Sequence, residues 1–439
     1  MNRRNFLKSA AATAAVLSAP LVLRAAETNK PAAEGDFLDQ ARERIGRHRQ
    51  GDCRVVVCDA KGRPVNGARV RVTQLGHDFL FGSNAFKVGR IQDPEREAAY
   101  RRQFAGLLNY ATLGFYWSMY EPEKGHPQYE YTDKVLEWCA SQGVACKGHP
   151  LAWDYVPDPR WLPEDAEGIR QASEGRVREI VNRFKGRIDR WDVVNEPTDM
   201  GRTKTRLGRW ANSMGAGRYT ADHLKVAREA NPAATLLVND YRTDEAFYKI
   251  LEGLRVDGRL PFDAVGIQSH MHDKVWPMAW VWDACERFAR LGLPVHFTET
   301  TIVSGAKNGD GKWGESSAAG EAAQAEYVPK FYTALFSHPS VEALTWWDFA
   351  DEGAWMQAPA GWLRKDMTPK PVYERLQSLI KGEWWTRLQG SADARGEYAL
   401  RAFYGRHQVV VEPPDGNGPN VTREVRWSRG GTNRLEVVV

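Results

Sequence analysis

Two glutamates stand at the ends of two short apolar runs, and their placement points to acid–base and nucleophilic chemistry. Glu196 ends residues 190–196, where aromatic and β-branched side chains favour a strand and the following Pro197 stops strand pairing. Glu299 ends a run of the same design, residues 294–299. A pair of carboxyls, one acting as acid and base and the other as nucleophile, can hydrolyse a glycosidic bond. Because Glu before Pro is also common in loops, this hypothesis depends on what positions the two residues.

Eight strand-like runs alternate with helical stretches along the middle of the chain. The runs cover residues 79–86, 111–117, 144–153, 190–196, 235–241, 264–270, 294–299 and 343–349, and helical stretches include 131–142, 169–184, 221–230, 279–291 and 322–337. This alternation predicts an α/β fold, a closed (β/α)8 TIM barrel, which carries its catalytic groups at the carboxyl ends of the strands. An open doubly wound sheet is the alternative, although no Gly-rich nucleotide-binding turn follows the first run.

The regions before and after the barrel differ from it in character. We predict a signal peptide at residues 1–26, a leader at 27–51, a small N-terminal β unit at 52–77, the catalytic barrel at 78–382 and a C-terminal β domain at 383–439. The N-terminal unit is expected to be a strand pair laid against the barrel. The C-terminal region has short alternating runs separated by Gly-, Asp- and Pro-rich turns, and it could either bind carbohydrate or be structural.

The first residues of the chain form a targeting pattern. Arg3 and Arg4 precede an Ala-rich, weakly apolar run at residues 9–23, which resembles the twin-arginine export signal of bacteria. The run is too short and too weakly apolar for a membrane span. We therefore expect export by the twin-arginine route to the periplasm or beyond, with no membrane attachment after processing. A cytosolic protein with an irregular N-terminus is the alternative.

The composition of the chain limits the kinds of molecule that it could bind. The net charge of +4 on 439 residues is too small to indicate nucleic acid or a membrane surface, and the 17 Trp could either stack on sugar rings or fill the core. Cys53 and Cys58 lie roughly 16 Å apart along one expected strand and cannot bridge, whereas Cys139 and Cys146 could either pair or stay as buried thiols. The spacing of Cys and His predicts no metal site, and the chemistry needs no cofactor.

Further polar and aromatic residues gather at the expected strand ends. His149 and Trp153 end the third run, and Trp347 ends the eighth. Gln268 and His270 end the sixth, where the two-residue period of a strand puts both on one face. Each residue alone could be a packed core residue, but packing does not explain such residues at so many strand ends of one barrel.

These pieces together resemble glycoside hydrolase family 10, the barrel xylanases. The matching segments, in family order, are residues 148–153, 191–197, 238–241, 268–270 and 298–299, Trp347 with Asp351 and Trp355, and residues 370–373. They span roughly residues 79–381. The resemblance implies a retaining hydrolase in which Glu196 is the acid/base, Glu299 is the nucleophile and the two carboxyls lie about 5–5.5 Å apart.

The resemblance also implies a set of sugar-binding residues and a monomer that acts on a polysaccharide or oligosaccharide. The set is His149, Trp153, Asn195, Tyr241, Gln268, His270, Trp347 and Trp355. Strict strand alternation cannot turn both Asn195 and Glu196 inward, so the backbone must twist just before Pro197. Three hypotheses stay open: an endo-β-1,4-xylanase or close relative, a glycosidase of the same barrel with another or a substituted β-glycan as substrate, and a non-catalytic sugar-binding barrel.

Two departures from the family pattern bear on the substrate. The family has a Glu-Asn-x-Met-Lys-Trp run that binds the sugar on the glycone side, and here Thr112, Leu113 and Tyr116 replace its Glu, Asn and Lys. The usual His after Trp153 is Asp154. We therefore expect weak activity on plain linear xylan and better activity on a decorated or related glycan. The Gly- and Ser-rich segment 302–320 could be a flap with Trp313 as a stacking platform, or a simple surface loop.

Overall fold

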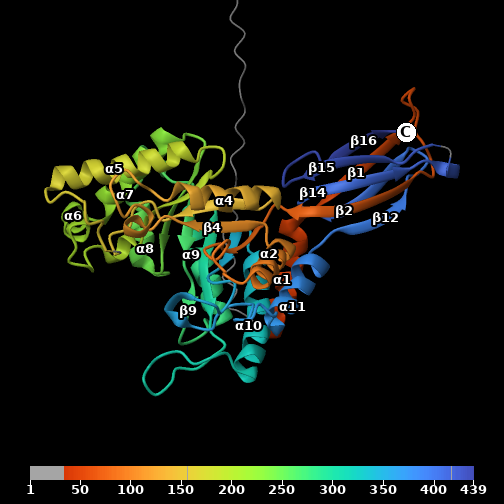
Figure 1. Ribbon diagram of the computed structural model, residues 1–439. Helices are drawn as coiled ribbons and strands as arrows, with labels where there is room; N and C mark the ends of the chain where they lie inside the picture. The colour runs from red at the N-terminus through yellow and green to blue at the C-terminus, as the bar shows by residue number, and fades with distance from the viewer. Residues whose placement is uncertain (1–33, 156, 417) are drawn as a thin grey trace, which may run out of the picture.

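The largest part of the protein is a closed barrel of eight parallel strands (Figure 1). The computed structural model describes residues 34–155, 157–416 and 418–439. The barrel strands are β3 (Leu80–Asn84), β4 (Tyr110–Gly114), β5 (Ala145–His149), β6 (Arg190–Asn195), β7 (Thr235–Asp240), β8 (Ala264–Ile267), β10 (Val295–Ile302) and β11 (Val341–Trp346). β11 pairs with β3 and closes the ring, while the short β9 (His270–Met271) pairs with β10. The expected barrel is confirmed, and each of the eight predicted runs overlaps one of its strands.

Helices cover the outside of the barrel and alternate with its strands. They are α2 (Pro94–Leu107), α3 (Trp117–Tyr120), α4 (Tyr129–Ser141), α5 (Ala166–Arg183), α6 (Arg206–Met214), α7 (Ala216–Ala230), α8 (Glu245–Glu252), α9 (Met278–Ala289), α10 (Ala318–Ser337) and α11 (Pro371–Ser378), with short turns at η1 (Pro197–Asp199), η2 (Trp355–Gln357), η3 (Leu379–Glu383) and η4 (Pro414–Gly416). α5 shows why they form where they do. The Asp165 side chain accepts a hydrogen bond from the N–H of Gly168 and caps the helix, and Ile169, Val177 and Ile180 bury one face.

A further helix, α1 (Glu34–Arg49), precedes the barrel and corrects the expected leader at 27–51. Phe37, Ala41 and Ile45 recur every four residues and are buried, which is the stripe of an amphipathic helix. At its end, the Arg49 guanidinium donates to the carbonyl oxygens of Phe336, His338 and Val341, each at 2.6 Å, and ties α1 to the end of α10. The predicted signal peptide, residues 1–26, lies outside the described residues.

The strands at the two ends of the chain form one β-sandwich rather than two separate units. One sheet has the order β13 (Glu397–Phe403), β1 (Gln50–Cys58), β16 (Arg434–Val438), and the other has the order β12 (Arg387–Ser391), β2 (Arg69–His77), β14 (Gly405–Glu412), β15 (Val421–Trp427). β1 and β2, which we expected to pair with each other, therefore lie in different sheets. Val55, Val72, Val409 and Trp427 are fully buried in the shared core. The residue 52–77 segment is thus half of a domain completed by the C-terminal strands.

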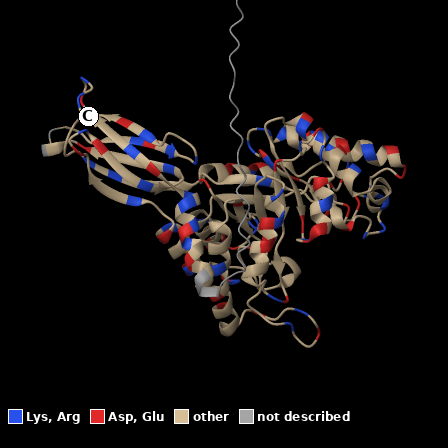
Figure 2. Cartoon of the chain, turned by 180° about the vertical axis from the view of Figure 1, so that it is seen from behind, with Lys and Arg blue, Asp and Glu red and all other residues tan. Residues whose placement is uncertain are grey.

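The outer faces of the sandwich carry charges of both signs. Figure 2 shows basic and acidic residues mixed along its strands. Arg54 pairs with Glu397, and Arg71 pairs with Glu412, across neighbouring strands. Exposed ion pairs of this kind contribute little to the free energy of unfolding, so the stability of the sandwich depends on its core.

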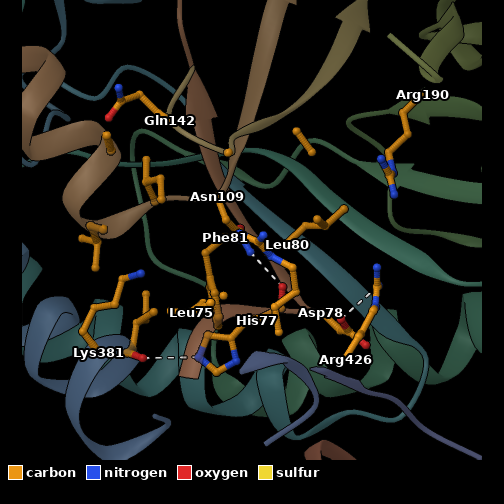
Figure 3. A pocket seen from close by; sticks show the side chains of 18 residues that line it. Leu75, His77, Asp78, Leu80, Phe81, Asn109, Gln142, Arg190, Lys381 and Arg426 are labelled. Atoms are coloured by element: carbon orange, nitrogen blue, oxygen red, sulfur yellow. Dashed lines mark hydrogen bonds and ion pairs between the residues drawn. The ribbon is translucent and has the colours of Figure 1, made fainter. Parts of the chain in front are cut away.

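The sandwich meets the barrel at the amino ends of the barrel strands, where the chain passes from β2 to β3. A cavity of about 250 Å³ lies at this joint and is lined by His77, Asp78, Asn109, Arg190 and Arg426, among others (Figure 3). The Arg426 guanidinium pairs with Asp78 at 2.9 Å. His77 is half-buried, and desolvation lowers its pKa to about 3, so it stays neutral. The joint lies at the end of the barrel opposite to the strand ends that carry Glu196 and Glu299.

The five cysteines are buried free thiols in the described chain. Hydrogen bonding to Cys139 and burial raise the pKa of Cys146 well above its usual value, so this thiol stays protonated. The structure thus has the thiol arrangement, and not the disulfide, of the two alternatives left open for Cys139 and Cys146.

The shared core predicts how the sandwich responds to mutation. Trp427→Ala removes a fully buried indole and should lower the free energy of unfolding of the sandwich by about 3–5 kcal/mol. Arg423→Ala, on the exposed part of the same strand, should change it by less than about 0.5 kcal/mol. Chemical denaturation of both variants measures the difference. Equal effects would mean that β15 is not part of a packed core.

Candidate active site

A large cavity opens at the carboxyl ends of the barrel strands and measures about 900 Å³. Its lining consists of Phe86, Lys87, Arg90, Tyr116, Met119, His149, Trp153, Tyr155, Asn195, Glu196, Arg202, Tyr241, Gln268, His270, Glu299, Trp347, Asp348, Gly353, Trp355 and Met356. All ten residues that the sequence suggested for the site are in this set. They come from six strands or the loops that follow them, so the barrel brings together groups that lie up to 206 positions apart between His149 and Trp355.

The backbone is left-handed at three strand ends that border the cavity. Glu196 has φ 56°, Ser269 has φ 58° and Asp348 has φ 66°. These values are uncommon for residues other than glycine and cost on the order of 1–3 kcal/mol each. At Glu196 this conformation follows Asn195 directly, and both side chains reach the cavity. The twist expected before Pro197 is therefore located at Glu196 itself.

Glu299 is 4% exposed and is held by neighbours on several strands. Asn239 Nδ2 donates to Glu299 Oε1 at 2.7 Å, and His270 Nε2 lies 3.1 Å from Oε2. The Thr298 hydroxyl donates to Asn239 Oδ1 at 2.6 Å and fixes the direction in which the Asn239 amide points. Burial alone would raise the pKa of Glu299, but His149 and His270 outweigh it and lower the pKa. The side chain is therefore a buried carboxylate.

A second buried charge supports His149. Asp192 Oδ2 lies 2.6 Å from Lys147 Nζ and 2.8 Å from His149 Nδ1, and all three side chains are almost completely buried. Burial alone would raise the pKa of Asp192, but Lys147 and His149 lower it below its usual value. His149 Nδ1 thus donates to a carboxylate, and its Nε2 lies 3.7 Å from Glu299 Oε1. The chain Lys147–Asp192–His149 fixes the imidazole ring beside Glu299.

The pKa of Glu196 is shifted in the opposite direction, above its usual value. Burial is the largest effect and raises its pKa, and the negative charge of Glu299 acts in the same direction. Gln268 Nε2 donates to Glu196 Oε1 at 2.9 Å, and Arg202 Nη2 donates to Oε2 at 2.5 Å. These two donors oppose the rise without cancelling it. The cavity therefore holds one carboxyl with a raised pKa and one with a lowered pKa, which is how a single site can supply an acid and a nucleophile.

Arg202 was not among the residues selected from the sequence, and its position depends on the departure at Asp154. Asp154 is buried, its carboxylate accepts from the N–H of Gly201 at 2.8 Å, and its carbonyl oxygen accepts from the Thr203 hydroxyl at 2.7 Å. The Arg202 guanidinium then lies over the Tyr155 ring at 3.7 Å. It also pairs with Asp199 at 2.9 Å. Asp154 thus anchors the loop that brings a cation to Glu196.

The altered segment 112–116 contributes one side chain to the cavity. Tyr116 lines it, whereas Thr112 and Leu113 are buried in the barrel. The centroid of the Tyr116 ring lies 6.0 Å from that of Phe86 and 5.6 Å from that of His149. The ring centroids of Phe86 and Trp347 are 5.3 Å apart. We name Phe86, Tyr116 and Trp347 the aromatic wall. The three residues come from the loops that follow β3, β4 and β11, so residues 112–116 supply only part of this wall.

Trp313 lies outside the cavity lining. The centroid of its ring lies 6.3 Å from that of His272. The ring centroids of His272 and Trp355 are 5.1 Å apart. Lys307 and Trp313 form an isolated bridge in the loop before α10, so this segment is a folded hairpin that projects from the barrel in Figure 1. Trp313 thus extends the aromatic surface beyond Trp355 without covering Glu196 or Glu299.

Some site residues had only a weak signal in the sequence. Asn239 lay in a motif that matched the family, but its bonds to Glu299 and Asn195 join strands 44 to 60 positions apart and show only in three dimensions. Gly266 allows this approach, because a Cβ there would lie 2.4 Å from Asn239 Oδ1. In the described residues there is no group of His, Cys, Asp and Glu that could hold a metal ion.

The targeting pattern also has a counterpart among known families. Residues 1–20 match the signal sequence of the twin-arginine translocation pathway. This match confirms the export signal and favours export to the periplasm or beyond over a cytosolic location. Among the helices that the structure describes, none is long and apolar enough to cross a membrane.

The chain resembles proteins that differ in length and role. It is 27% identical to the anti-sigma-I factor RsgI6 of Acetivibrio thermocellus over 91% of this chain and 50% of that protein, and 25% identical to endo-1,4-beta-xylanase 1 of Arabidopsis thaliana over 79% of this chain and 35% of that protein. It thus spans about half or less of these relatives. The crystal structure of xylanase 10B from Thermotoga petrophila RKU-1 with xylobiose shares the fold, with a TM-score of 0.61 and 24% identity over 70% of this chain and 95% of that one.

Residues 73–379 match the model of glycosyl hydrolase family 10. Because this match covers well over half of the chain, the protein belongs to glycosyl hydrolase family 10.

Proposed function

We propose that the protein is a retaining glycoside hydrolase that cleaves a xylan-type β-1,4-glycan, with Glu299 as nucleophile and Glu196 as acid/base. The observation that carries this proposal is the pair of buried carboxyls with opposite pKa shifts in one cavity. A non-catalytic sugar-binding barrel would gain nothing from a buried carboxylate held by three polar neighbours. All the groups involved come from one chain, so we propose that the monomer is active.

The reaction follows from the two protonation states. The Glu299 carboxylate attacks the anomeric carbon while the glycosidic C–O bond breaks, and Glu196 gives its proton to the leaving oxygen. A covalent ester to Glu299 results. Glu196, now a carboxylate, takes a proton from water, whose oxygen attacks the same carbon and releases Glu299. Esterification removes the negative charge of Glu299 that raised the pKa of Glu196, so the change of role from acid to base is favourable.

The remaining residues position the sugar. We propose that Asn195 and His149 bind hydroxyls beside the scissile bond, while Trp153, Trp347 and Trp355 pack against the sugar rings. Tyr241 lies beyond Glu196, near Asp199, and would face the leaving sugar. The aromatic wall takes the place of the family's charged glycone binders and suits a decorated chain better than plain linear xylan. Product analysis on xylo-, cello- and manno-oligosaccharides separates a xylanase from a glycosidase of the same barrel with another substrate.

The carboxyl pair gives the first test of this function. Glu299→Ala should abolish turnover, and azide added to Glu299→Gly should yield a glycosyl azide of inverted configuration. Glu196→Ala should lose activity on natural glycan but keep the first step on aryl glycosides, because a good leaving group needs little acid assistance. Glu424→Ala, in the sandwich, is the control. Product chromatography measures each outcome, and near-normal glycan cleavage by either mutant would refute the assignment.

The contact between His270 and Glu299 predicts a change in the acidic limb of the pH profile. A hydrogen bond to the ionised carboxylate lowers the pKa of Glu299, so His270→Ala should raise that pKa, and activity should be lost at a higher pH on the acid side. A bond to a charged group contributes about 1.5–3 kcal/mol, which corresponds to roughly one to two pH units. Thr301→Val, which removes the partner of His270 Nδ1 and a 3.5 Å bond to the Glu299 carbonyl oxygen, leaves the His270–Glu299 contact in place and should shift the limb less. A profile of kcat/KM against pH that keeps its acidic limb in His270→Ala would contradict this role.

Arg202 predicts a change in the alkaline limb. Its positive charge lowers the pKa of Glu196 against the rise caused by burial. Arg202→Met should therefore raise the pKa of the acid, and kcat/KM should persist to higher pH than in the wild type. Arg202→Lys, which keeps a charge at this position, should give an intermediate profile. An alkaline limb that moves to lower pH in Arg202→Met would exclude this electrostatic effect.

A further inference from the structure

Two cations on the loop between β3 and α2 line the cavity without an acidic partner. Lys87 and Arg90 are both part of the lining. Within the described residues neither side chain forms an ion pair, whereas Arg202, the third cation of the lining, pairs with Glu196 and Asp199. Unpaired positive charges in a substrate cavity raise the local concentration of anionic groups.

The ammonium of Lys87 occupies the space that a side chain at position 353 would fill. Gly353 has φ +55°, and a Cβ on this residue would lie 2.1 Å from Lys87 Nζ. Asp348 is the carboxylate on this side of the cavity, and the charge of Lys87 lowers its pKa against the larger rise caused by burial. Its oxygens accept from the N–H of Trp355 at 2.7 Å and from Asn84 Nδ2 at 3.5 Å, and in the described residues no ion pair or hydrogen bond joins it to Lys87. The donors of the Lys87 ammonium thus remain available to a ligand.

Arg90 is held by an aromatic ring rather than by a carboxylate. Its guanidinium lies over the Tyr131 ring at 3.8 Å, and the Tyr131 hydroxyl donates to the carbonyl oxygen of Phe86 at 3.0 Å. The N–H of Arg90 donates to the carbonyl oxygen of Lys87 at 2.9 Å and keeps the two residues in one turn. A guanidinium stacked by its face leaves the N–H groups at its edge free, and this planar edge matches a carboxylate.

The position of this turn identifies the half of the cavity concerned. Lys87 directly follows Phe86, which belongs to the aromatic wall. Arg202 bonds to Glu196 and Tyr241 bonds to the nearby Asp199, so both lie beside the acid, where the proposed reaction places the leaving sugar. Lys87 and Arg90 therefore lie on the glycone side.

We propose that Lys87 and Arg90 form a carboxylate-binding subsite that selects a β-1,4-glycan carrying a uronic acid on its glycone side. This inference rests on the proposed glycosidase function and names the chemistry of the decoration. The aromatic wall would pack against the sugar rings, and the two cations would bind the carboxylate of the uronic acid.

The test compares a xylo-oligosaccharide with one glucuronic-acid branch and the same compound after reduction of its carboxyl to a primary alcohol. The two differ only in the carboxylate. Wild-type kcat/KM should be about tenfold or more higher for the acidic compound, since a charge-assisted bond contributes at least this factor. The preference should fall to an intermediate value in Lys87→Met, approach unity in Lys87→Met/Arg90→Met and return in Lys87→Arg. It should also shrink as salt is raised.

Two measurements keep this inference separate from the function on which it rests. Lys124→Met removes an exposed cation that does not line the cavity and should keep the wild-type preference. Calorimetric binding of both compounds to Glu299→Gln should show the same preference without any turnover. Cleavage without preference for the acidic compound would overturn the carboxylate subsite and leave the glycosidase function intact. Absence of cleavage would overturn the function, and equal binding of the two compounds, or binding of neither, would overturn the subsite.

Discussion

The constraint on which the active site depends is that Glu299 is removed from water and yet ionised. A bare carboxylate cannot be buried without a large free-energy cost, so its neighbours must supply the stabilisation that water would give. Asn239 and His270 donate directly, and the positive field of His149 and Lys147 adds to them. Each of these donors is itself held by a hydrogen bond, from Thr298 to Asn239 and between Thr301 and His270. The interactions of Glu299 therefore extend to several barrel strands. The same charge raises the pKa of Glu196, so one buried carboxylate sets both protonation states.

Much of this arrangement could be predicted from the sequence, and the reason is periodicity. The eight barrel strands show as apolar runs, and the polar residues that end them were identified because a barrel gathers its strand ends. The sandwich was missed because its order depends on pairings such as Gln50 with Phe403, which no local pattern encodes. The helix α1 was missed because its stripe of three buried residues is short and follows a polar leader.

The cations that line the cavity were harder to find, because they lie on loops. Arg202, Lys87 and Arg90 follow no strand or helix period, and each would be an ordinary surface cation by composition. Their significance comes from contacts that only the fold creates: Asp154 with Gly201, Gly353 with Lys87, and Tyr131 with Arg90. The substitution at 154 was visible in the sequence, but its consequence at Glu196 was not.

The hydrogen bonds of Glu196 determine which of its oxygens has room for the proton that it gives as an acid. Oε1 accepts from Gln268 and from Asn195, whereas Oε2 accepts from Arg202 alone and keeps a free lone pair. Gln268 is the less free of the two, because its amide also faces Asn195, whose oxygen accepts from Asn239, and Thr298 fixes Asn239. Arg202 comes from a surface loop and retains a second partner in Asp199. The proton therefore belongs on Oε2, the oxygen that faces Arg202 and has the free lone pair.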